Sequence, residues 1–202
     1  MLNRIRQRGV TLIELMVGVA LIGIIAAFAA PSLSTTLQSR RIRTAADSIQ
    51  SGLQYAKNEA LRRNRNVSFT LQSTTAAAWQ VGCDPADDTV VSGEAVCASV
   101  LQTRSAAEGT SITAIATSEI ISSTGATASG LFSTKLRFTS LGRVDTATMV
   151  GGHSAVILVS NPAGGACVVD GGEMRCLKVI VSSSGLIRMC DPAVAAGDPR
   201  AC

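Results

Sequence analysis

Residues 8–30 read RGVTLIELMVGVALIGIIAAFAA, and this stretch decides how the rest of the chain is organised. Apart from Thr11 and Glu14, every residue from position 10 to the one before Pro31 is apolar or small. Twenty-one helical residues extend for roughly 30 Å, which is the thickness of the hydrocarbon core of a bilayer. We therefore predict that residues 10–30 form a transmembrane helix.

The charges around this run are unevenly distributed. Arg4, Arg6 and Arg8 precede it, and a neutral stretch follows it. Positive charge stays on the cytoplasmic side of a membrane, so the remainder of the chain is expected in the periplasm of a bacterium, after a single pass through the inner membrane. Removing the three arginines lowers the formal net charge from +4 to +1, which gives no general case for nucleic-acid binding.

Glu14 is the single charge inside the apolar run. A carboxylate is costly in a bilayer and rare there unless it has a partner. The alternative is a secretory signal that is cleaved in the alanine-rich residues 26–30, but such signals have shorter apolar cores. A discarded leader gains nothing from a costly carboxylate, whereas a retained helix can pair it with a cation of a neighbouring helix. We therefore expect the helix to be kept.

The stretch from Arg8 to Leu15 resembles the class III signal of type IV pilins and type II secretion pseudopilins. The resemblance implies that residues 1–9 form a prepilin leader, that a prepilin peptidase cuts after Gly9, and that the new N-terminal residue, Val10, is methylated. It also implies that Glu14 pairs with the N-terminal amine of a neighbouring subunit during assembly. The family usually has Phe after the cut, so Val10 favours a minor subunit.

An amphipathic pattern follows Pro31 and continues through residues 31–66. Its apolar positions recur at helical spacing: Leu33, Leu37, Ala45, Ala46, Ile49, Leu53, Ala56 and Ala60. We predict one helix from Val10 to about Arg63, kinked at Pro31 and roughly 80 Å long, which ends at Asn64-Arg65-Asn66. The arginines at 40, 41, 43, 62, 63 and 65 are compatible with a nucleic-acid patch, but a solvated helix face is favoured.

Residues 67–202 carry β patterns and predict a periplasmic globular domain. The expected strands are residues 67–71, 136–138, 155–159 and 177–181, separated by turn clusters. Residues 104–130 are rich in Ser, Thr and Ala and have no clear pattern. A long helix followed by short strands and hairpins indicates an α+β fold, with the helix packed on an antiparallel β-sheet.

All six cysteines lie between residues 83 and 202, and their spacings lack the C-x-x-C pairs of a structural zinc site. An even number of cysteines after a membrane-targeting segment indicates disulfides in an oxidising compartment, with buried free thiols as the alternative. Six cysteines allow fifteen pairings. We favour the three sequence-neighbour pairs because each closes a short loop: Cys83–Cys97, Cys167–Cys176 and Cys190–Cys202.

No arrangement of residues predicts catalysis, a metal site or a cofactor. His153 is the only histidine, and its two preceding glycines favour a turn or surface position. Asp84, Asp87 and Asp88 lack the spacing of an EF-hand loop, so a solvated loop is favoured over calcium binding. Trp79 is expected in the core or in a sheet. We expect that the protein is not an enzyme.

Three later segments resemble the GspH/FimT branch of the pilin family: residues 53–71, residues 138–143 and the tail that begins at Val181. Some FimT-type members act in DNA uptake through a Gly-Arg-x-Arg pattern after a C-terminal glycine. Here that stretch is Gly185-Leu186-Ile187-Arg188, so only its last arginine matches. The resemblance implies a DNA contact by Arg188 alone, and losing the first arginine weakens such binding. Arg200, with Arg143 or Arg175 as further candidates, could complete a small basic patch for DNA.

The favoured function is a minor pilin-like subunit of the tip or initiation complex of a type IV pilus. Its expected partners are other pilins or pseudopilins, prepilin peptidase and an inner-membrane assembly platform. Two alternatives stay open. The chain is a minor pseudopilin H of the type II protein secretion system, or it is a pilus subunit that binds DNA during natural transformation.

Overall fold

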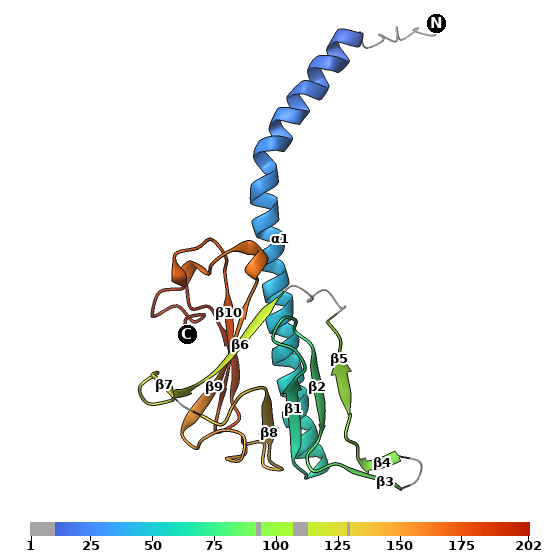
Figure 1. The fold of residues 1–202 in the computed structure, drawn as a ribbon, viewed down its shortest axis with the longest axis vertical. Helices are drawn as coiled ribbons and strands as arrows, with labels where there is room; N and C mark the ends of the chain where they lie inside the picture. The colour runs from blue at the N-terminus through green and yellow to red at the C-terminus, as the bar shows by residue number, and fades with distance from the viewer. Residues whose placement is uncertain (1–10, 92–93, 107–112, 129) are drawn as a thin grey trace, which may run out of the picture. The chain divides into compact units, whose positions relative to one another are not determined.

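The computed structural model describes residues 11–91, 94–106, 113–128 and 130–202. Within these ranges, the side chains of residues 27–35, 94 and 95 are not described. The chain forms two compact units, Met1–Leu37 and Gln38–Cys202. One helix, α1 (Leu12–Arg63), begins in the first unit and ends in the second (Figure 1). The kink at Pro31 stays a prediction, since Pro31 is one of the residues whose side chains are not described.

The end of α1 follows the prediction from sequence. Asn64 has a positive φ of 50°, the left-handed conformation that often stops a helix, and asparagine tolerates it better than most residues. The backbone N–H of Arg65 then donates to the carbonyl oxygen of Ala60 at 3.2 Å. Arg62 and Arg63 occupy the last turn, where their charge complements the negative end of the helix dipole.

The strands of the described residues form three antiparallel sheets. The four-stranded sheet has the order β5 (Gln102–Arg104), β2 (Trp79–Cys83), β1 (Val67–Leu71) and β8 (Lys135–Phe138). The five-stranded sheet has the order β11 (Ile187–Cys190), β10 (Leu177–Ser182), β9 (His153–Ser160), β6 (Ala114–Ile121) and β7 (Thr127–Ala128). A separate hairpin joins β3 (Asp87–Val91) to β4 (Glu94–Cys97), and two short 3-10 turns, η1 (Pro162–Gly164) and η2 (Val168–Asp170), link β9 to β10.

The α+β prediction is confirmed, and the four strands expected from sequence correspond to β1, β8, β9 and β10. The other strands were not predicted. Residues 104–130, which have no clear pattern, contain β6, whose eight residues pair with the whole length of β9. Small and polar residues take part in this strand because β9 pairs with it along its whole length and β7 pairs with its end on the other side.

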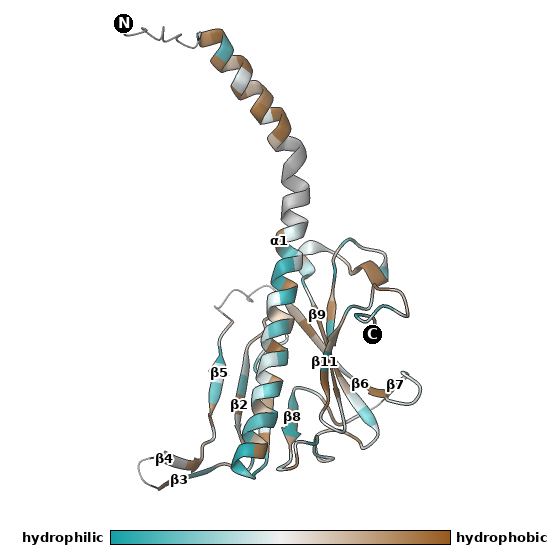
Figure 2. Cartoon of the chain, turned by 180° about the vertical axis from the view of Figure 1, so that it is seen from behind, coloured by the Kyte–Doolittle hydropathy of each residue, from teal (hydrophilic) through white to brown (hydrophobic). Residues whose placement is uncertain are grey.

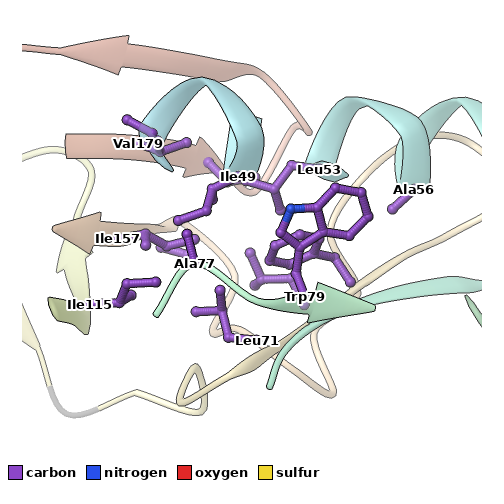
Figure 3. Packing of buried hydrophobic residues seen from close by; sticks show 14 of the residues in the cluster. Ile49, Leu53, Ala56, Leu71, Ala77, Trp79, Ile115, Ile157 and Val179 are labelled. Carbon is purple, nitrogen blue, oxygen red and sulfur yellow. The ribbon is translucent and has the colours of Figure 1, made fainter. Parts of the chain in front are cut away.

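One stripe of α1 in the second unit is buried completely. Its members recur at three- and four-residue spacing: Ile42, Ala45, Ala46, Ile49, Leu53, Ala56 and Ala60. Both large sheets contribute to the cluster beneath the stripe. Figure 3 shows Leu71 and Trp79 of the four-stranded sheet together with Ile157 of the five-stranded sheet, close to Ile49 and Leu53 of the helix. The helix therefore forms a core with both sheets at once.

Trp79 makes the polar connection inside this core. Its indole N–H donates to the hydroxyl oxygen of Ser48 at 2.9 Å, and both residues are buried. Its ring lies 5.8 Å from that of Phe69, centroid to centroid. Gly52 is needed at this contact, because a Cβ there would come within 2.8 Å of both rings. Two positions on the helix thus hold Trp79 in place.

Glu59 is the buried charge of the helix. It accepts hydrogen bonds from Arg62 at 2.8 Å and from Arg63 at 2.7 Å. Burial opposes its ionisation, but the hydrogen bonds and charges of the two arginines outweigh that effect, so the pKa of Glu59 is lowered. Arg63 also donates to the carbonyl oxygen of Val96 at 3.3 Å, which connects the helix end to the β3–β4 hairpin.

Changing Ser48→Ala is expected to lower the free energy of unfolding by about 1–3 kcal/mol, because the buried indole N–H of Trp79 loses its acceptor. Urea unfolding followed by fluorescence measures this directly, since Trp79 is the only tryptophan. Ser51→Ala is the matched control: Ser51 is exposed and bonds only to the carbonyl of Asp47 in its own helix. Equal losses in both variants would contradict the role of Ser48.

Changing Glu59→Gln is expected to destabilise the fold by about 1.5–3 kcal/mol at pH 7, because charge-assisted hydrogen bonds are lost. A carboxyl with a lowered pKa stabilises the fold above its unfolded pKa and loses that contribution as the pH falls through its folded pKa. The difference from the unaltered chain should therefore shrink below pH 4.5. The control is Asp47→Asn, which removes an exposed 3.9 Å pair with Arg43 and should cost little at any pH.

Candidate assembly site

Thr11 and Glu14 hold the start of α1. The backbone N–H of Thr11 donates to Glu14 Oε2 and the backbone N–H of Glu14 donates to Thr11 Oγ1, each at 3.4 Å. This reciprocal arrangement is a capping box, here with long hydrogen bonds. Its T-x-x-E spacing is visible in the sequence, and the capping role of Glu14 was not predicted from it. Glu14 therefore has a structural function within its own chain.

The first turns of α1 expose apolar side chains all round. Ten large hydrophobic residues are between 52% and 78% exposed: Leu12, Ile13, Leu15, Met16, Val17, Val19, Leu21, Ile22, Ile24 and Ile25. In Figure 2 these turns are coloured mostly as hydrophobic, with a hydrophilic position near their start. A soluble monomer rarely exposes so large a continuous apolar surface, so another apolar environment has to cover it.

No helix in the part of the chain that the structure describes is both long enough and apolar enough to cross a membrane. The membrane-spanning role of residues 10–30 stays a prediction. Gly9 and Val10, the expected processing positions, lie outside the described residues. The expected partner of Glu14, an amine of another subunit, belongs to an assembly, so this role also stays a prediction.

Three disulfides connect cysteines that neighbour one another in sequence, with Cα–Cα distances of 5.1–5.5 Å. Cys83–Cys97 closes the β3–β4 hairpin, Cys167–Cys176 closes the loop that holds η2, and Cys190–Cys202 ties the tail to β11. Together they use all six cysteines of the chain. The domain is thus crosslinked at three separate loops, as is typical of proteins in oxidising compartments.

The candidate DNA-binding arginines are mostly engaged. Arg188 donates to the carbonyl oxygen of Cys202 at 3.1 Å, and Arg175 lies 3.3 Å from the carboxylate of Asp191. Arg200 makes two hydrogen bonds to Asp198, which lower the pKa of that carboxyl to about 2 and raise the pKa of the guanidinium. The charges of Arg175 and Arg200 are therefore balanced by neighbouring carboxylates.

His153 begins β9 and is more buried than its neighbouring glycines suggested. Its Nδ1 lies 2.8 Å from the carboxylate of Glu119, whose side chain is fully buried and also accepts the backbone N–H of Phe132. Sequence could not show this pair, because 34 residues separate its members. Across the described ranges, no three His, Cys, Asp or Glu side chains gather as metal ligands do.

Comparisons with solved structures return pilin-like proteins. The Pseudomonas aeruginosa type IV minor pilin FimU is 17% identical, with a TM-score of 0.49 over 78% of this chain and 94% of that one. The minor pseudopilin EpsH from the type 2 secretion system of Vibrio cholerae is 12% identical, with a TM-score of 0.46 over 76% and 99%. Escherichia coli GspH is 14% identical, with a TM-score of 0.40 over 80% and 93%. No curated protein matches significantly.

Two family models match the sequence. The prokaryotic N-terminal methylation motif matches residues 4–30, which include the apolar run and Glu14. The model described as type II transport protein GspH matches residues 45–185, from the buried stripe of α1 to the turn before β11. Because this second match covers more than half of the chain, the protein belongs to the GspH family of minor pilins and pseudopilins.

Proposed function

We propose that this protein is a minor subunit of a pilin-like filament, with a structural and not a catalytic role. One observation carries the proposal: the exposed apolar turns of α1 contain a single charge, Glu14, and continue into a helix that forms the core of a disulfide-linked domain. Such a chain can exchange one apolar environment for another without refolding the domain.

The apolar turns need a cover both before and after assembly. In this proposal the lipid bilayer covers residues 10–30 first, and the helices of neighbouring subunits cover them in the filament. The second environment is the better one for Glu14. A carboxylate in lipid is costly without a partner, whereas a filament brings it close to a neighbour's positive charge.

The partner of Glu14 would arise from processing. Cleavage after Gly9 by a prepilin peptidase removes Arg4, Arg6 and Arg8 and leaves the methylated amine of Val10. That amine lies next to the N-terminus of α1, where the helix dipole disfavours positive charge. A carboxylate from a neighbouring subunit offsets this unfavourable interaction. We propose that this pairing sets the axial position of each subunit, while Thr11 keeps the start of the helix closed.

The proposed function also places each part of the chain relative to the inner membrane. The three arginines of the leader hold the N-terminus in the cytoplasm, an inner-membrane platform lifts the processed subunit, and the domain Gln38–Cys202 lies in the periplasm. Three disulfides support a periplasmic domain, because that compartment is oxidising.

Replacing Glu14 separates its two roles. Glu14→Gln keeps a capping-box side chain but removes the charge, whereas Glu14→Ala removes both. We expect both variants to be inserted and processed normally, and both to fall at least about tenfold in sheared filaments, as expected when one member of a buried charge pair is lost. Immunoblots of membranes and sheared filaments measure this. Normal incorporation of Glu14→Gln would show that capping, not charge, is what matters.

A type IV pilus and a type II secretion pseudopilus both fit this mechanism. The description of the matching family favours a role in type II transport, whereas the departure at Val10 and the three disulfides favour a surface-exposed pilus subunit. DNA binding is less well supported, because Arg175 and Arg200 are paired with carboxylates and a leucine occupies position 186.

Deleting the gene in its native host distinguishes the two machines. A pilus subunit is expected to reduce surface pili and twitching while exported enzymes reach the medium normally. A pseudopilin is expected to leave pili unchanged and to retain those enzymes in the periplasm. Complementation with the unaltered chain should restore whichever property is lost, and an effect on neither property would contradict the proposed function.

A further inference from the structure

Three exposed leucines from distant parts of the chain meet beside the C-terminal end of α1. Leu61, Leu141 and Leu186 are 47%, 78% and 63% exposed, and we call them the leucine patch. Gly142 connects them: an ideal Cβ on it would lie 3.4 Å from both Leu61 methyl carbons, and its carbonyl oxygen fills the space where a Cβ of Gly185 would be. The three leucines therefore lie on chain segments that contact one another.

Tight turns hold two of these leucines in place. Gly142 and Gly185 have φ values of 73° and 82°, and each donates its N–H to the carbonyl oxygen three residues earlier at 2.8 Å. A shallow hollow of about 240 Å³ lies beside Leu186, lined also by Gln54, Lys57, Asn58, Gly185 and Ile187. Because these turns are already ordered, binding here costs little conformational entropy.

The border of the patch is positively charged. Lys57 donates to the carbonyl oxygen of Gly185 at 2.8 Å and keeps its charge unbalanced by that contact. Arg143 is exposed, and its guanidinium has no ion-pair or hydrogen-bond partner in the described part of the chain. The turns themselves, residues 139–143 and 182–188, contain no acidic residue. An aliphatic partner that carries negative charge is thus complementary to this surface.

The β3–β4 hairpin of the same chain has these properties. Val90 and Val91 on β3 are 65% and 59% exposed. The segment from Cys83 to Cys97 contains four acidic residues and no lysine or arginine: Asp84, Asp87, Asp88 and Glu94. Asp84 is paired with Lys135 at 2.7 Å and Asp87 with Arg65 at 3.2 Å, so Asp88 carries the negative charge that the exposed valines present to a partner.

The base of this hairpin is fixed to the domain. The Cys83–Cys97 disulfide closes it, and Arg65 lies 3.2 Å from Asp87. Hydrogen bonds from Thr89, together with Arg65, lower the pKa of Asp87, so it is ionised at neutral pH. Asp88 is exposed and accepts one hydrogen bond, from the backbone N–H of Ser99 at 3.0 Å. The carboxylate of Asp88 is therefore available to a cation of another molecule.

One copy cannot place its hairpin on its own patch. Successive residues of a helix are rotated by about 100°, so Leu61 beside the patch and Arg63 beside the hairpin point about 160° apart. The patch and the hairpin therefore lie on opposite flanks of α1. Only a second molecule can bring a hairpin to this patch.

We propose that the leucine patch of one copy binds the β3–β4 hairpin of a second copy. One valine of β3 would cover the leucines, because Val90 and Val91 are consecutive and face opposite sides of the strand, and Asp88 would face Arg143. Such a contact joins two different surfaces, so each copy in a pair keeps one free patch and one free hairpin. The inference goes beyond the proposed function, because the contact lies within the unit Gln38–Cys202 and does not involve Glu14.

Photo-crosslinking of the full chain in detergent micelles tests the contact. With p-benzoylphenylalanine at position 186, illumination should give a dimer that survives reduction, and its crosslinked peptide should include residues 87–91. The same label at Val169, which is exposed on η2 and distant in sequence from the patch, is the matched control and should give at least about fivefold less dimer.

Charge reversal then identifies the partner surface. Arg143→Glu and Asp88→Arg should each lower the dimer yield about fivefold, the equivalent of ~1 kcal/mol, and the double variant should recover it. Urea unfolding of each variant shows whether the fold is retained. The proposal would be overturned if no dimer forms, or if both label positions give equal amounts of dimer. It would also be overturned if the double variant does not recover the dimer, or if the crosslinks map outside the hairpin.

Discussion

The burial of one stripe of α1 against two sheets is the constraint on which the rest of the structure depends. Ile49 and Leu53 contact a core to which both large sheets contribute, so the helix connects two layers that are otherwise separate sheets. Alanines at 45, 46, 56 and 60 allow the strands to approach the helix closely. The Ser48–Trp79 hydrogen bond lies inside this apolar contact. Because both groups are buried and need each other as partners, the bond favours one packing of the helix on the sheet over other packings.

This stripe also determines what the remaining faces of the helix can do. On one flank, Glu59 and Arg63 organise the helix end and hold the β3–β4 hairpin at Val96. On the other flank, Lys57 and Leu61 lie beside the turns at Gly142 and Gly185. The helix therefore presents the hairpin on one flank and the leucine patch on the other, and its buried stripe lies between the two flanks. In the first unit, the large apolar residues of the same helix from Leu12 to Ile25 are exposed.

Local patterns explain which elements could be predicted. The strands at 67–71, 136–138, 155–159 and 177–181 have enough aliphatic and aromatic residues to be recognised, and Asn64 marks the end of the helix. By contrast, β6 has a mixed composition and is a strand because β9 pairs with it along eight residues. Similarly, sequence gave no signal for the Glu119–His153 pair, since strand pairing brings these residues together from positions 34 apart.

The sequence by itself determined the apolar run with its single carboxylate, the helix that follows, the α+β class and the even number of cysteines. These features depend on composition and on spacings of a few residues, and the T-x-x-E capping box is of the same kind. Only the tertiary structure decided that Arg175 is paired with Asp191, that Arg63 binds the hairpin, and that the segments carrying Leu61, Leu141 and Leu186 lie together. Contacts of these kinds depend on how strands pair and turns close across the fold, and no local periodicity encodes them.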